Sequence, residues 1–122
     1  MRNATTVLLV FAMLPAMAQP AFPTEFPPGA TELTSEQLTR LLDGHVYRLK
    51  PVKGPEIRIE YRGEVAYMTI GSNSDTGKWR VDKSSICIEW TNRPAGCSEV
   101  RMVGNVLYSK RPSGEVLPVV PD

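Results

Sequence analysis

The chain has 122 residues, of which 42% are hydrophobic and 22% are charged. This length fits one domain, and the hydrophobic fraction excludes a wholly disordered chain. A formal net charge of +1 argues against a dedicated nucleic-acid-binding protein, and two cysteines with one histidine argue against a protein-ligated zinc or iron–sulfur site. We therefore expect a small single-domain protein with no metal or other cofactor.

Residues 1–18 have the three-part pattern of a secretory signal peptide. Arg2 supplies positive charge, residues 7–14 form an uncharged apolar run, and Ala16 and Ala18 are small residues where a signal peptidase reads them. The apolar run is too short for a membrane anchor, which needs about 20 residues. The pattern predicts cleavage after Ala18 and a periplasmic or secreted protein.

An exported chain meets oxidising conditions, so the two cysteines, Cys87 and Cys97, are expected to form a disulfide. There is no Cys-x-x-Cys motif, and His45 lies far away in sequence. These features favour a structural cross-link over a redox-active pair or a free nucleophile.

Residues 19–31 contain four prolines, which fix backbone dihedrals and remove hydrogen-bond donors. This composition predicts an extended N-terminal arm, which Phe22 and Phe26 could dock onto the body of the protein. Residues 32–122 are then expected to form a single helix-plus-β domain.

The first element of that domain is a short helix, predicted over residues 35–43. Thr34 is suited to the N-cap, and Gln37 lies at the spacing that a capping box requires. Gly44 is a suitable stop after the last turn. The expected role of this helix is to cover one side or end of a sheet.

From His45 onward the hydrophobic period changes to two, and turn signals recur at regular spacing. Such short strands are typical of an antiparallel up-and-down barrel or sandwich, so we predict a mainly β fold of seven to eight strands. Pro118 predicts that the last strand lies at an edge or a frayed end. The predicted strands cover residues 45–50, 56–62, 64–70, 78–82, 85–91, 97–103, 106–110 and 115–120.

Two hairpins have registers that the sequence predicts. A turn at Arg62-Gly63 would bring apolar residues of both flanking strands to one face. A second hairpin over residues 92–96 would place Cys87 opposite Cys97, within disulfide reach. The pairs expected in the first hairpin are Ile59 with Ala66 and Ile57 with Met68.

The longer connections in this meander are predicted at 51–55, 71–77, 92–96 and 111–114. Because alternate connections lie at the same end, these four should gather at one rim, where binding surfaces concentrate. The rim would carry more cations than acids, namely Lys53, Lys78, Arg93, Lys110 and Arg111 against Glu56, Asp75 and Glu115.

This rim is the candidate binding site for an anionic or sugar-like ligand or for a protein partner. The alternative interpretation is a set of solvated loops whose charges serve solubility. The predicted binding residues are Asp75, Lys78, Asn92, Arg93 and Arg111.

Catalytic residues are not predicted, and we expect that the protein is not an enzyme. His45 has no serine or cysteine nucleophile identifiable nearby. Trp79 and Trp90 could stack a sugar or a base, but they fit a core better. Glu89 and Glu99 could form an acid pair, but arginines on their strands favour exposed ion pairs.

Three neighbouring segments form one pattern, namely Gly77-Lys78-Trp79-Arg80-Val81, Ile86-Cys87-Ile88-Glu89-Trp90 and Gly96-Cys97-Ser98-Glu99-Val100. This pattern resembles small exported proteins of Gram-negative bacteria, many known only as domains of unknown function. The resemblance covers residues 31–110 and implies a periplasmic location, with no catalytic residues to transfer. A looser comparison is with periplasmic lysozyme-inhibitor barrels, whose Ser-Gly-x-x-Tyr type of loop is absent here.

The sequence thus predicts an accessory or binding protein of the bacterial envelope. It would engage an envelope protein or a small anionic ligand through the long-loop rim, and it would bind no nucleic acid and span no membrane after signal cleavage. The alternative is a proteinaceous inhibitor of an exogenous hydrolase such as a lysozyme or a protease.

Overall fold

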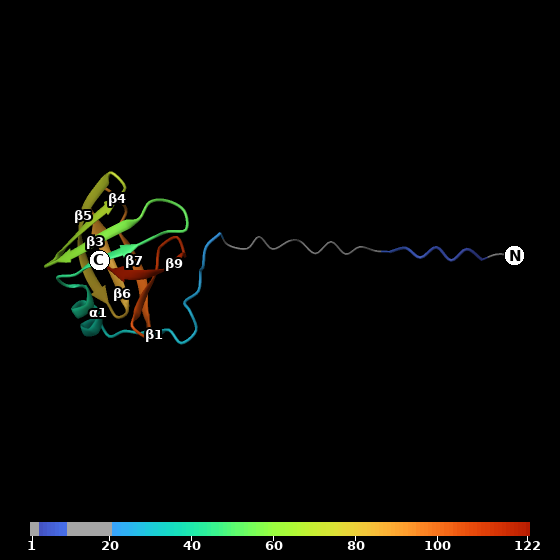
Figure 1. Ribbon diagram of the computed structural model, residues 1–122, viewed down its shortest axis with the longest axis horizontal. Coiled ribbons are helices and arrows are strands. Elements are labelled where there is room, and N and C mark those ends of the chain that lie inside the picture. The colour runs from blue at the N-terminus through green and yellow to red at the C-terminus, as the bar shows by residue number, and fades with distance from the viewer. Residues whose placement is uncertain (1–2, 10–20) are drawn as a thin grey trace.

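The computed structural model describes residues 3–9 and 21–122. In these residues, eight of the nine strands form a closed antiparallel barrel, and the one helix lies at one end of it (Figure 1). The predicted mainly β fold is confirmed, and it is a barrel rather than a sandwich. The predicted signal peptide covers residues 1–18. Of these, residues 1–2 and 10–18 lie outside the described part of the chain, and residues 3–9 form no helix or strand.

Eight strands follow one another around the barrel in chain order, and the last pairs with the first to close it. A ninth, β1 (Thr31–Glu32), pairs with β7 from outside this circuit. The barrel strands are β2 (Val46–Leu49), β3 (Ile57–Arg62), β4 (Val65–Ile70), β5 (Asn73–Asp82), β6 (Ser85–Trp90), β7 (Gly96–Val103), β8 (Val106–Lys110) and β9 (Val116–Pro121).

The prediction that Pro118 places the last strand at an edge is wrong, because β9 has partners on both sides. It pairs with β8 from Val116 to Val119 and with β2 at Val120 and Pro121. Pairing with β2 begins only after Pro118, so the proline stands where that side of the strand has no ladder partner.

The hairpin of β3 and β4 has a different register from the predicted one. Its turn is Gly63-Glu64, where Gly63 has a positive φ of 60°, and the true cross-strand pairs are Ile57 with Ile70, Ile59 with Met68 and Tyr61 with Ala66. The shift is two residues on the β4 strand. Because side chains alternate with a period of two, this shift keeps the apolar residues on the inner face.

Helix α1 (Ser35–Leu42) closes the end of the barrel at which the β5–β6 turn lies. Its capping box between Thr34 and Gln37 is present as predicted. Leu38 and Leu42 are both fully buried in the barrel core. The helix is joined to the turn because Ser84 Oγ accepts a hydrogen bond from the backbone N–H of Leu33, at 2.9 Å.

The described part of the N-terminal arm lies against the barrel wall. The guanidinium of Arg101 stacks over the ring of Phe26, 4.7 Å from its centroid. The backbone N–H of Val116 donates to the carbonyl of Pro23, at 2.8 Å. Residues 21–34 therefore run along the outside of the barrel, from the start of β9 to helix α1.

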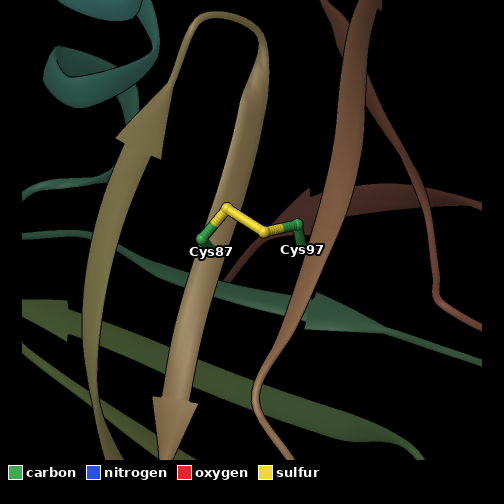
Figure 2. Close-up of a disulfide and its surroundings, with 2 residues drawn as sticks. All are labelled: Cys87 and Cys97. Atoms are coloured by element: carbon green, nitrogen blue, oxygen red, sulfur yellow. A yellow bond between two sulfur atoms is a disulfide. The ribbon is translucent and has the colours of Figure 1, made fainter.

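The predicted disulfide between Cys87 and Cys97 joins β6 to β7 on the outside of the barrel (Figure 2). The two cysteines are direct cross-strand partners, with Cα atoms 4.0 Å apart. The two neighbours of Cys87, Ile86 and Ile88, point to the opposite, inner face and belong to the core. The bridge therefore fixes the wall without occupying the interior.

An aromatic cluster fills the interior near the helix. The ring of Tyr61 meets that of Trp79 edge to face, with centroids 5.2 Å apart, and Tyr47 lies beyond it. Burial, with a smaller contribution from Tyr47, raises the pKa of the Tyr61 phenol, so the hydroxyl is neutral at ordinary pH. This close packing requires a glycine at position 77, because a Cβ there would lie only 2.7 Å from the carbonyl oxygen of Glu89.

Candidate functional site: a cavity at the open end of the barrel

The barrel interior contains a cavity of about 300 Å³. Its inner wall is apolar and comes from several strands, with Ile57, Ile59, Met68, Ile70, Ile88 and Val119 as its aliphatic lining. The lining reaches exposed residues of two connections, Arg93–Ala95 and Pro112. The cavity therefore opens to solvent at the end of the barrel opposite helix α1.

The cavity exists because part of the wall carries small side chains. An eight-stranded barrel is only wide enough for its own side chains or one small ligand, so the size of each inward residue matters. On β7 and β8 the inward positions in the lining are Gly96, Ser98 and Ser109. These residues leave open the space that isoleucines fill on the facing strands.

We call the open end of the barrel the mouth, and it is bounded by the connections 50–56, 71–72, 91–95 and 111–115. Three of the four connections predicted there are long. The fourth is a two-residue turn at Gly71-Ser72, so the predicted loop 71–77 is wrong. The sequence predicts a loop here because the first part of β5 lacks alternating apolar residues. Its buried positions are occupied by Asp75 and Gly77.

Two arginines of the predicted binding set line the cavity at the mouth, Arg93 and Arg111. Arg111 Nη1 lies 3.5 Å from Oε1 of Glu115, whose side chain is only 4% exposed. Arg93 has no ion-pair partner among the residues that the structure describes. The lining of the mouth therefore offers one arginine already partnered by an acid and one without such a partner.

Asp75 and Asn92, also in the predicted set, lie together at the mouth but bind each other. Asp75 is buried, and its carboxylate accepts hydrogen bonds from the Asn92 side-chain amide at 3.1 Å and from the Asn92 backbone N–H at 3.2 Å. It also accepts from the backbone N–H of Thr76 at 2.9 Å. This carboxylate therefore holds the start of the connection that carries Arg93.

The structure does not bring Lys78 into this group. Lys78 is exposed in the middle of β5, opposite Val65 on one side and Glu89 on the other, and it does not line the cavity. Lys110 likewise belongs to β8 and lines a polar groove beside the N-terminal arm. Two of the three lysines predicted at the rim, Lys78 and Lys110, therefore lie on the outer wall of the barrel.

The other side chains that the sequence singled out lie apart from the cavity, except one. His45 is exposed, with Nδ1 2.9 Å from the carbonyl oxygen of Asp43. Glu99 forms an ion pair with Arg101 at 2.7 Å, as expected. Trp90 is the exception, because it packs against the core as expected and also lines the cavity near the mouth.

Comparisons with protein-family models, with curated proteins and with solved structures gave no match for this chain. The features that carry the resemblance to small exported proteins are present as structure, namely the Cys87–Cys97 disulfide and Trp79 in an aromatic cluster. The membership of that group stays a prediction.

In residues 3–9 and 21–122, no helix is both long enough and apolar enough to cross a membrane. Within the same ranges, no group of three or more His, Cys, Asp or Glu side chains is placed to hold a metal ion.

Proposed function

We propose that the protein is an exported, non-enzymatic binding protein that takes a small anionic ligand at the mouth of its barrel. The single observation that supports this most is the cavity, because it opens beside Arg93 and Arg111. Ligand sites in proteins are typically apolar clefts with a few convergent polar groups, and the mouth has that composition. A cavity favours a small ligand over an envelope protein as the partner.

Export is part of the same proposal. The N-terminal residues have the pattern of a signal peptide. The Cys87–Cys97 disulfide suits the periplasm or the cell exterior, where disulfides persist. Inhibition of an exogenous hydrolase stays the alternative function, and a lysozyme and a protease assay with the purified protein separates the two.

The binding proposal is tested with two small aromatic probes of similar shape, benzoate and uncharged benzamide. We expect calorimetry to show tighter binding of benzoate, and the difference should shrink as salt is added, because the arginines at the mouth are partly exposed. Replacing Arg93 with glutamate should weaken benzoate binding by about five- to tenfold, since an attractive charge becomes a repulsive one.

The matched control is Lys78→Glu, which makes the same charge change on the outer wall of the barrel. It should leave benzoate binding within about twofold of the wild type, since screening weakens charges that lie far apart. Equal affinity for benzoate and benzamide, or an equal loss in the Lys78 and Arg93 variants, would contradict a specific anion site at the mouth.

A further inference from the structure

The cavity combines an apolar interior with an opening lined by two arginines, and this combination selects a class of ligand. We propose that the ligand is a single-chain amphipathic anion, with an unbranched alkyl chain inside the barrel and its anionic group beside Arg93. This inference rests on the proposed function and names the chemistry of its ligand.

The interior favours a chain rather than a second polar group. Beyond the mouth the lining is aliphatic or aromatic, apart from the hydroxyl-bearing side chains of Ser98, Ser109 and Tyr61. No acidic or basic side chain lines the inner part of the cavity within the described residues, where Arg93 and Arg111 are the charged lining residues. A polar ligand group buried there would lose hydration with few partners to replace it.

The volume of the cavity limits the ligand to one chain. At about 300 Å³ it lies at the lower end of the range found for ligand pockets, which is roughly 300–1,000 Å³. Helix α1 closes the other end of the barrel through Leu38 and Leu42, so a chain can enter only to a limited depth. We therefore expect medium-length chains to bind best.

The charges at the mouth favour an anionic rather than a cationic head group. Glu115 is 3% exposed and lies against Arg111, so it offsets the charge of that arginine. Arg93, on the connection that Asp75 anchors, has no such partner among the described residues. Together with the buried Asp75, these side chains carry no net charge. Asp75 does not line the cavity, whereas the exposed Arg93 does, so Arg93 supplies the attraction for an anion where the chain enters.

The two parts of the ligand contribute unequally. Each methylene group moved from water into the cavity should raise affinity about fourfold. An exposed ion pair with Arg93 should contribute only about two- to fivefold. The chain thus supplies most of the affinity, and Arg93 sets the preferred charge and the orientation.

The test measures binding of hexanoate, octanoate, decanoate and dodecanoate to the mature, disulfide-bonded protein by calorimetry. Affinity should rise about fifteenfold for each two added carbons until the cavity is filled, and then level off. Decanoate should bind more tightly than decanol, and decylamine should bind most weakly. Decanoate and a lysophospholipid with the same chain then show whether the natural source is a free acid or a lipid.

Three variants locate the two parts of the ligand. Arg93→Gln should weaken decanoate about two- to fivefold without changing decanol binding, whereas the wall control Lys78→Gln should change neither. Glu115→Gln should strengthen decanoate binding, because Arg111 is then released from its internal partner. Ser109→Leu should fill the cavity and abolish the chain-length effect, and Ser98→Leu provides a second blocking variant if the first does not fold.

The outcomes separate this inference from the function on which it rests. Arg93-dependent binding of benzoate with no effect of alkyl chain length would overturn the chain proposal and leave an anion site at the mouth. Chain-length dependence with equal affinity for decanol and decanoate would overturn the anionic preference and the proposed function together. Full chain-length dependence in both leucine variants would contradict a chain inside the barrel.

Discussion

Replacing Cys87 and Cys97 together with alanine is expected to lower the free energy of unfolding by about 3 kcal/mol. The disulfide joins directly opposed residues of β6 and β7, which are 10 positions apart in the sequence. It stabilises the protein by restricting the conformations of the unfolded chain. A domain of this size has a net stability of about 5–15 kcal/mol, and the loss is therefore a large share of it. Urea denaturation followed by tryptophan fluorescence measures the effect.

The control for this prediction is the wild-type protein with its disulfide chemically reduced, which should unfold at nearly the same urea concentration as the double variant. Because the bridge lies outside the barrel and not in the cavity lining, the folded variant should still bind benzoate. A loss of stability below about 1 kcal/mol, within the range of ordinary surface substitutions, would contradict a structural role for the cross-link.

Replacing Leu42 with alanine should cost about 2–5 kcal/mol of stability, the usual range for truncating a buried leucine. Leu42 is 0% exposed and anchors helix α1 in the end of the barrel. Leu42 belongs to the core cluster, so its truncation leaves a cavity at the closed end of the barrel. Thermal and urea unfolding of the purified variant give the change in the free energy of unfolding.

The matched control is Arg40→Ala, a truncation on the exposed face of the same helix. It should change stability by no more than about 0.5 kcal/mol, since Arg40 is exposed to solvent. Equal effects of the Leu42 and Arg40 substitutions would mean that the helix does not seal the barrel.

The disulfide and the order of the strands follow from local patterns in the sequence. Alternating apolar residues define the inner face of β3 and β4, and this face is insensitive to the two-residue error in the predicted register. The position of Cys87 opposite Cys97 follows from the hairpin predicted over residues 92–96. Closure of the barrel through β9 does not follow, because Pro118 reads locally as an edge residue.

Sequence patterns do not predict the cavity, because its volume depends on side chains that face one another across the barrel. Gly96, Ser98 and Ser109 are unremarkable in their own strands, and only the closed barrel sets them opposite isoleucines. A regular period of two could have placed Ser98 and Ser109 on the inner face, but not the space they leave.

Some of the predicted binding residues lie where the sequence pattern placed them, and others do not. Asn92 and Arg93 lie at the mouth because the order of strands puts their connection there. Asp75 was predicted to bind a ligand, but its carboxylate is used within the protein to hold Asn92. Lys78 lies in the middle of a strand rather than at the mouth because β5 begins at Asn73, five residues earlier than predicted.

The position of the ligand is tested most directly by nuclear magnetic resonance of the methyl groups of isoleucine and valine during titration with decanoate. Val119 and Val120 are adjacent in β9, but Val119 lines the cavity whereas Val120 is 51% exposed on the outside. We expect large shifts at Val119, Ile57 and Ile88, with Val120 and the exposed Val106 unchanged. Saturating shifts at Val120 and Val106 with none at Val119 would place the ligand on the outer surface and contradict a binding site inside the barrel.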